Sequence, residues 1–336
     1  MLRFVLRRLI QMVGVVLVLS VLVFVWLRSL PGGPVSALLG ERGTPERRAA
    51  LEKALGLDQP LPVQYLRYME RAVQGDFGVS TKVLPGEDAL DIFFTRLPAT
   101  IELSFFALVI AIALGIPLGY LAARRKGTPL DTATVIFSLV GVAVPVFFTG
   151  FLLKYFFAVE WNLLPVSGRQ STGLDATRVT GLFVLDGILT REWDAAWDAL
   201  KHLVLPAVAL ATIPFAVIFR ITRASVLDVL DEDYVRTAEA KGLTAQVIRG
   251  RHVLRNAMLP VVTTVGLQVG ALLSGAVLTE TVFSIRGIGD ALATAFRDKD
   301  YPVLQVLIIA AAAIYVLVNL LVDIAYAVID PRIRTR

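Results

Sequence analysis

This chain of 336 residues contains no cysteine and only two histidines. The absence of cysteine excludes disulfide bonds, cysteine nucleophiles and thiolate metal sites. The sequence also lacks a GxxxxGKS/T phosphate loop, so we expect no ATP hydrolysis by the chain itself. With no nucleophile and base pair apparent in the pattern, we predict no catalytic residues and no metal site.

Charged residues are scarce as well, at 18%, whereas 56% of residues are hydrophobic and the mean hydropathy is +0.70. A soluble fold of this length has little use for so much apolar surface. Six apolar windows approach or exceed the length that crosses about 30 Å of hydrocarbon, and each is predicted to be a helix because lipid leaves no other way to satisfy the backbone. The windows are Leu9–Leu27, Leu103–Ala123, Ala133–Ala158, Leu203–Phe219, Ala257–Leu278 and Val303–Val328. The fourth is the weakest, since it is short and contains Pro206 and Pro214.

The distribution of Lys and Arg predicts the orientation in the membrane. With the N-terminus inside, the cytoplasmic segments 1–8, 124–132, 220–256 and 329–336 hold 16 Lys and Arg against 7 Asp and Glu. The opposite segments, 28–98, 159–202 and 279–301, hold 16 against 19. We therefore expect both termini in the cytoplasm, with an uncleaved first helix. The basic residues are spread over short segments, which argues against nucleic-acid binding, and His202 and His252 fall on opposite sides, so they cannot share a metal ion.

Residues 233–260, DYVRTAEAKGLTAQVIRGRHVLRNAMLP, form a polar island between two apolar windows. Tyr234–Lys241 is predicted to be a short helix, preceded by acidic residues that suit its positive N-terminal dipole. Gly242 permits a sharp turn, and Thr244 can cap the helix that follows. Small Ala238 permits another surface to approach closely. The pattern favours a docking surface, the alternative being an ordinary solvated loop.

Two segments on the other side, 31–98 and 159–202, are long enough to fold. In the first, Thr44 predicts a helix start and Gly56 its end, and a second helix is predicted from Pro62. We interpret the apolar stripe of this second helix, formed by Tyr65, Met69 and Val73, as packing against the membrane helices. The tryptophans of the second segment, Trp161, Trp193 and Trp197, are typical of the headgroup level. Either segment could instead contact a soluble partner.

Several blocks, read together and in order, resemble the peptide, nickel and opine permease family of ATP-binding cassette importers, and its first permease subunit in particular. They are GLDQPLPVQYLRY (Gly56–Tyr68), GDFGVS (Gly75–Ser80), RLPATIEL (Arg96–Leu103), TRASVLDVLDEDYVRTAEAKG (Thr222–Gly242), RHVLRNAMLPVVT (Arg251–Thr263), ETVFS (Glu280–Ser284), GIG (Gly287–Gly289) and DYPV (Asp300–Val303). The family's cytoplasmic loop has Ala, then Gly four residues later, and a Leu-Pro pair that opens the next membrane helix. The sequence departs from the pattern at Arg236, where Glu is common, and at Arg286, where Pro is expected.

The resemblance implies an all-α integral membrane protein with six transmembrane helices and the type I ABC importer permease fold. The expected organisation is helix 1 in residues 1–30, an extracytoplasmic helical segment in 31–98, a five-helix permease core in 99–330 with a cytoplasmic coupling loop at 220–256, and a cytoplasmic tail in 331–336. Residues implied in coupling to an ATPase are Tyr234, Arg236, Thr237, Ala238, Lys241, Gly242 and Pro260.

Polar residues inside the windows are candidates to line a translocation path, since polar groups at bilayer depth usually face an interior or a cavity. Asn319 and Asp323 lie four apart on one helix face, and Gln268 lies between two glycines. They could instead bond to a neighbouring helix or, for Gln268, permit close helix packing. We interpret Glu102 and Lys154 as interfacial anchors or partners of other groups.

The resemblance further implies a complex in the bacterial inner membrane. Its expected parts are a second homologous permease subunit, two ABC ATPase subunits or one two-domain ATPase that bind ATP and Mg²⁺, and an extracytoplasmic substrate-binding protein. The expected cargo is a di- or oligopeptide, with a nickel chelate or another small solute as the alternative. From other classes, an ion-driven secondary transporter is disfavoured because no internal repeat is found, and a membrane-anchored scaffold does not explain the polar residues in the windows.

Overall fold

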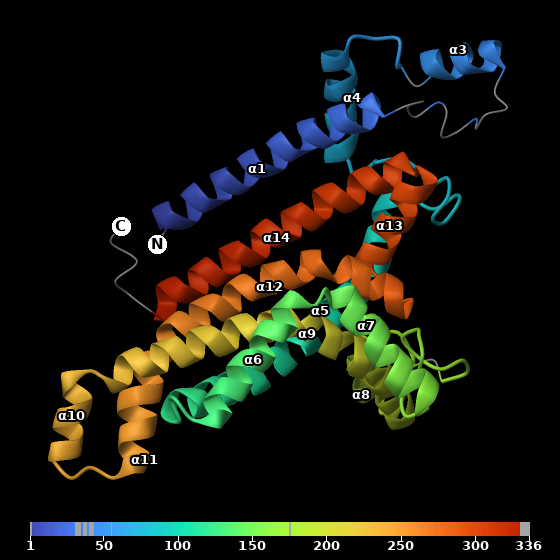
Figure 1. Cartoon of the computed structure of the whole chain (residues 1–336). Coiled ribbons are helices and arrows are strands. Elements are labelled where there is room, and N and C mark those ends of the chain that lie inside the picture. Colours follow the sequence, from blue (N-terminus) through green and yellow to red (C-terminus); the bar gives the residue numbers. More distant parts are fainter. Residues whose placement is uncertain are drawn as a thin grey trace. The chain divides into compact units, whose positions relative to one another are not determined.

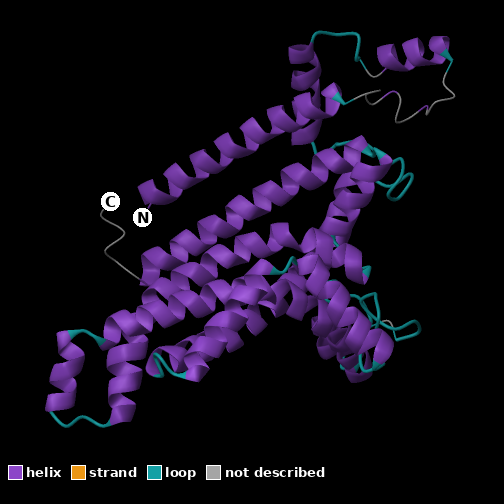
Figure 2. Cartoon of the chain, viewed as in Figure 1, coloured by secondary structure: helices purple, strands orange, loops and turns teal. Residues whose placement is uncertain are grey.

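The computed structural model describes residues 2–30, 35, 39, 44–54, 56–174 and 176–329, and this part of the chain is helical without a β-strand (Figures 1 and 2). The predicted tail, residues 331–336, lies outside the described residues. The helices are α1 (Leu2–Ser29), α3 (Pro45–Ala54), α4 (Leu61–Val73), α5 (Ala89–Arg124), α6 (Pro129–Ala143), α7 (Val146–Leu153), the π-helical η2 (Lys154–Glu160), α8 (Phe183–Leu189), α9 (Trp193–Leu230), α10 (Asp233–Ala240), α11 (Ala245–Val247), the π-helical η3 (Ile248–Leu254), α12 (Arg255–Phe283), α13 (Ile288–Asp298) and α14 (Tyr301–Ile329).

Five helical segments of the described chain are long and apolar enough to cross a membrane: α1, α5, α9, the run from α11 into α12, and α14. A sixth span exists if α6 and the α7–η2 segment are counted together. The prediction of a single helix over Ala133–Ala158 is wrong, because this segment bends by 104° at its centre.

The bend in the third window has a local cause at Pro145. The pyrrolidine ring disfavours helical backbone angles for the residue before it, and Val144 is extended, with φ −83° and ψ 125°. Pro145 itself, at φ −59°, then begins α7. By contrast, α9 continues through both Pro206 and Pro214, as a membrane helix can when neighbouring groups compensate for the lost backbone bonds.

The chain forms two compact units, one of residues 1–100 and 286–336 and one of residues 101–285. In the first unit, α1 packs on α14 and α13 packs on α14. The unit also contains the start of α5, which begins at Ala89, inside the segment predicted to be extracytoplasmic. Its core joins residues distant in sequence, namely Val23, Leu27, Ala89, Ile92, Phe93, Ala291, Ala295, Tyr301, Val303, Leu304, Val306 and Leu307.

Helices α3 and α4 follow the predicted signals. Gly56 has a positive φ of 65° just beyond α3, as a stop signal requires. The predicted stripe on α4 is confirmed in part: Ser20 Oγ lies 2.8 Å from Tyr65 Oη and donates to Met69 Sδ at 3.8 Å. The inclusion of Val73 in the packed stripe is wrong, since its side chain is 81% exposed.

In the second unit, α9 is the central helix and packs against α6, α7, α8 and α12. Helix α5 approaches α9 closely at Gly119, where an added Cβ would lie 2.7 Å from the carbonyl oxygen of Phe219. Only glycine fits at that distance, because real Cβ atoms do not approach backbone oxygen so closely.

Glu102 and Lys154 are both partnered within the second unit, as predicted. Buried Glu102 accepts from Arg169 Nη2 at 2.7 Å and from the backbone N–H of Val184 at 2.8 Å, so it fixes both Arg169 and the first turn of α8. Lys154 Nζ donates to the carbonyl oxygen of Val282 at 3.0 Å. Burial and an arginine partner explain why a carboxylate is retained near the end of an apolar window.

Candidate functional site

The polar island forms a helix, a turn and a second helical run, which together project from the ends of α9 and α12 (Figure 1). Helix α10 spans Asp233–Ala240, one residue displaced from the predicted Tyr234–Lys241, and Asp233 lies in its first turn as the dipole argument requires. After the turn, α11 passes through η3 into α12. The predicted short helix is therefore confirmed.

The turn after α10 is a Schellman motif centred on Gly242. The N–H of Leu243 donates to the carbonyl oxygen of Ala238 at 3.3 Å, and the N–H of Gly242 donates to that of Glu239 at 2.9 Å. Gly242 has φ 74°, a left-handed conformation that costs a residue with a Cβ more than it costs glycine. The predicted sharp turn is confirmed, and it fixes the angle at which the chain leaves α10.

Helix α10 packs against the rest of its own unit through one apolar face, which we call its seat. Val235 and Ala238 are buried, and Ala238 is only 4% exposed. The cluster that holds them draws on α5, α9, η3 and α12 and contains Ala123, Val226, Ile248, Val253 and Ala257. Small Ala238 does permit close approach, as predicted, but the approaching surface belongs to this chain.

The opposite face of α10 is open. Tyr234, Arg236, Thr237 and Lys241 are all exposed, with Arg236 at 69% for its side chain. Asn256 Nδ2 donates to Tyr234 Oη at 3.0 Å, which ties α10 to the start of α12. The ion pair of Arg236 with Asp233, at 3.8 Å, is long and solvated, so it adds little stability. This face can be contacted without disturbing the seat of the helix.

Two expectations for the loop are corrected. Thr244 stands at the N-cap of α11, but its side chain makes no capping hydrogen bond; only its carbonyl oxygen accepts, from Ile248. Pro260 does not open the next membrane helix, since α12 begins at Arg255 and continues from η3. Pro260 lies exposed inside α12, where the helix tolerates the loss of one backbone donor.

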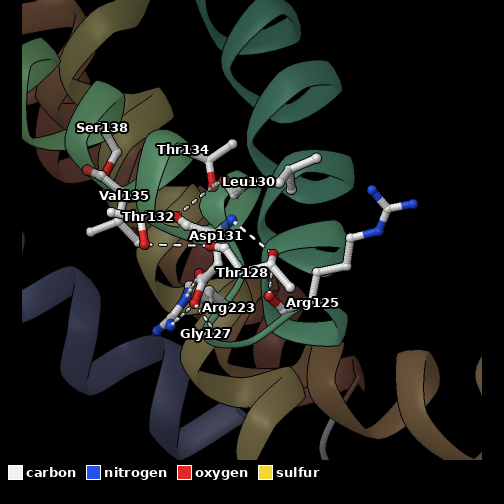
Figure 3. Close-up of polar contacts among 10 residues, drawn as sticks. All are labelled: Arg125, Gly127, Thr128, Leu130, Asp131, Thr132, Thr134, Val135, Ser138 and Arg223. Carbon is white, nitrogen blue, oxygen red and sulfur yellow. Dashed lines mark hydrogen bonds and ion pairs between the residues drawn. The ribbon is translucent and has the colours of Figure 1, made fainter.

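An ion pair that the sequence did not predict, between buried Asp131 and half-buried Arg223, lies where α6 begins (Figure 3). Arg223 of α9 donates from Nε to Asp131 Oδ1 at 2.7 Å and from Nη2 to Oδ2 at 2.8 Å. The backbone N–H of Gly127 also donates to Asp131 Oδ2, at 3.0 Å. This two-bond geometry is the strong form of an arginine–carboxylate pair, and it ties the basic 124–128 turn to α9.

The partners of this pair are far apart in the chain, so spacing could not reveal it. One weak signal existed: Asp131 is the single acidic residue in the segment 124–132, which is otherwise basic. Arg223 lies in α9, only a few turns before the chain enters α10. The pair therefore connects the turn between α5 and α6 to the helix that leads into α10.

The path candidates lie in different units. Gln268, in α12, is half-buried between buried Gly266 and Gly270, which fits close helix packing. Asn319, in α14, lines a groove of about 800 Å³ against α1. The side chain of Asp323 lies outside the described part of the chain. Among the described residues no cluster of His, Cys, Asp and Glu suited to a metal is present.

The described residues define a helical membrane protein with five or six spans and a folded polar loop between two of them, an architecture found among transporters. Comparison with known families narrows this class. The model of the family described as "Binding-protein-dependent transport system inner membrane component" matches residues 115–335, and that of its N-terminal domain matches residues 1–104. The chain therefore belongs to this family.

Curated relatives resemble the chain over nearly its whole length. The dipeptide transport system permease protein DppB of Escherichia coli K12 is 46% identical over 339 residues, covering 99% of each chain. The di/tripeptide transport system permease protein DppB of Pseudomonas aeruginosa UCBPP-PA14 is 44% identical, again covering 99% of each. The probable D,D-dipeptide transport system permease protein DdpB of E. coli K12 is 40% identical and covers 95% of each.

These findings confirm the predicted family, the all-α permease fold of type I, and a multi-pass protein of the inner membrane. The chain is a permease component of an ABC importer.

Proposed function

We propose that the chain is the permease subunit of an importer for di- and oligopeptides, and that it forms half of the translocation path. The support is the likeness to relatives named as dipeptide and di/tripeptide permeases over 99% of the chain. The best-supported site is the loop 233–260, in which a short helix is seated by one face and open on the other.

In this proposal the open face of α10 docks on an ATPase subunit, and its buried face transmits the movement. Tyr234, Arg236, Thr237 and Lys241 contact the ATPase, and exposed Leu243 of the adjoining turn adds apolar area. Ala238 and Gly242 act indirectly, the first by seating α10 and the second by setting the turn. Because α10 packs on α5, α9 and α12, a displacement of α10 is transmitted to three membrane helices.

The remaining partners follow from the family. A second, homologous permease subunit completes the path, two ATPase subunits or one two-domain ATPase bind ATP and Mg²⁺, and a substrate-binding protein delivers peptide from outside. Gln268, Asn319 and Asp323 remain our candidates for the path, and Pro260 for the coupling loop. From the distribution of Lys and Arg we infer that both termini lie in the cytoplasm.

Cysteine labelling tests this topology on a chain that has no cysteine of its own. We expect an impermeant maleimide to label Lys82→Cys and Val179→Cys from outside in intact cells, and to label Lys241→Cys only after the membrane is opened. All three positions are exposed, whereas Arg169 holds buried Glu102 and is unsuited to replacement. Labelling of position 241 from outside would overturn the topology and with it the ATPase-docking proposal.

Gly242→Val tests the coupling turn. A β-branched residue at positive φ is strained by about 1–3 kcal/mol, so α10 should shift from its docked angle. We expect normal membrane insertion, reduced copurification with the ATPase, and loss of most uptake of a labelled dipeptide by the assembled complex.

Gly250→Val is the matched control for this turn. Both glycines have open space around an added Cβ, but only Gly242 has a positive φ. Equal uptake and ATPase copurification in the two variants would contradict the role of the turn. No dipeptide uptake by the wild-type complex would contradict the proposed substrate instead.

A further inference from the structure

A small pocket in the first unit lies where α1 ends and α14 begins. Its volume is about 260 Å³, and its walls come from the end of α1, the start of α14, α4 and the loop at residues 77–81. The candidate spans end at Ser29 in α1 and begin at Tyr301 in α14. The pocket therefore lies at the level where apolar membrane helix gives way to polar chain.

Three cations and no carboxylate line this pocket: Arg28, Arg71 and Lys299. Arg28 is held in place, because its Nε donates to Gln64 Oε1 at 2.7 Å and its guanidinium carbon lies 3.6 Å from the centre of the Phe24 ring. Its two terminal nitrogens have no acceptor among the described residues, which leaves a guanidinium edge available for a ligand.

Two buried donors of the same lining also lack a partner. Tyr68 Oη and Gln305 Nε2 make no hydrogen bond within the described chain, although the residues are only 5% and 8% exposed. Burial, with a further contribution from Tyr65, raises the pKa of the Tyr68 hydroxyl, so it remains a neutral donor. Buried donors are nearly always paired in native proteins, so an unmet acceptor is expected here.

The neighbouring carboxylate does not meet this need. Asp300 follows Lys299, and its Oδ2 is turned into the 80–83 loop, where it accepts from Ser80 Oγ at 2.7 Å. The same oxygen accepts from the backbone N–H groups of Thr81, Lys82 and Val83 at 3.1, 2.9 and 3.0 Å. The buried Oδ1 of Asp300 makes no hydrogen bond within the described chain, so it does not pair with Tyr68 or Gln305. Asp300 thus stabilises the loop that forms one wall, and it does not line the pocket.

We propose that this pocket binds a phosphate-type anion, supplied by the headgroup of an anionic phospholipid or by free phosphate. A guanidinium edge matches phosphate oxygens geometrically, and the two unpaired donors can complete the oxygen shell. The level of the pocket at the ends of two spans suits a headgroup, and cationic groups there attract anionic lipid. The site is independent of the proposed transport function.

The test uses the purified full-length chain. Inorganic phosphate is titrated by calorimetry, and retained lipid is measured by native mass spectrometry after exchange into phosphatidylglycerol or phosphatidylcholine nanodiscs. The pocket variant combines Arg71→Gln with Lys299→Gln, and the control combines Arg67→Gln with Arg297→Gln. All four side chains are exposed, and only the first two line the pocket. We expect the pocket variant to bind about ten-fold more weakly or worse, and the control to bind like the wild type.

A third variant, Gln305→Leu, separates a built site from a general attraction of charge. It keeps the net charge but removes one unpaired donor, so the ligand should bind more weakly while the ligand-free chain becomes no less stable. Binding of phosphate alone would assign a free-anion site, and binding only of phosphatidylglycerol would assign a lipid site. No binding of either, or equal losses in pocket and control variants, would overturn the proposal. Retention of a soluble binding protein through Arg71 and Lys299, without phosphate or lipid binding, would also overturn it.

Discussion

Ala238→Trp should abolish peptide uptake while the membrane helices still insert. Ala238 is buried in the cluster that seats α10, and an indole there cannot be accommodated without moving the helix. Overpacking of this kind costs about 1–3 kcal/mol, and here that cost is relieved by tilting α10 away from α5, α9 and α12. We expect normal amounts of subunit in the membrane, weak copurification with the ATPase, and uptake near background.

Ala240→Trp is the control, because Ala240 belongs to the same helix and is exposed. It adds the same bulk to α10 without entering the cluster. If Ala238→Trp supported uptake and ATPase copurification as well as wild type, the packing of α10 through Ala238 would not be required for coupling. If Ala240→Trp alone failed, the ATPase would contact the face around Ala240 so closely that bulk there is excluded.

Asp131→Asn should destabilise the second unit strongly. The change leaves the Arg223 guanidinium without its counter-charge. Removing one member of a fully buried pair costs about 3–5 kcal/mol; the Arg223 side chain is 27% exposed, so we expect a loss of about 3 kcal/mol or less. Thermal unfolding in detergent measures the loss, and we expect reduced assembly with the partner subunits.

Asp228→Asn is the matched control, since Asp228 is an exposed carboxylate of α9 and has no such partner among the described residues. A double replacement of Asp131 and Arg223 by leucine should recover part of the stability, because it leaves neither charge buried alone. Unfolding of Asp131→Asn at the same temperature as Asp228→Asn would refute a stabilising pair.

Local signals explain which parts of the loop could be predicted. Helix formers between acidic residues and Gly242 define α10, and a glycine after a helix is the usual residue for a left-handed C-terminal cap. Thr44, Gly56 and Pro62 act in the same way for α3 and α4. In each case the determining groups lie within one turn of the structure that they specify.

The sequence-based predictions were wrong or incomplete where contacts between distant segments determine the structure. Periodicity could not say that Ala238 faces its own chain, because α10 is polar on most of its surface and the cluster comes from four other elements. The Asp131–Arg223 pair joins helices far apart in sequence. Val73 continued the spacing of the α4 stripe, but it is exposed, whereas Tyr65 and Met69 contact Ser20 of α1.

By itself the sequence determined the membrane class, the location of the apolar windows and the polar loop, because hydropathy and turn residues act over short distances. Only the tertiary structure decided which face of α10 is free and that residues 286–336 join the first 100 in one unit. It alone placed Arg28, Tyr68 and Gln305 around one pocket. These outcomes depend on helix packing between distant segments, whose side-chain partners no local pattern encodes.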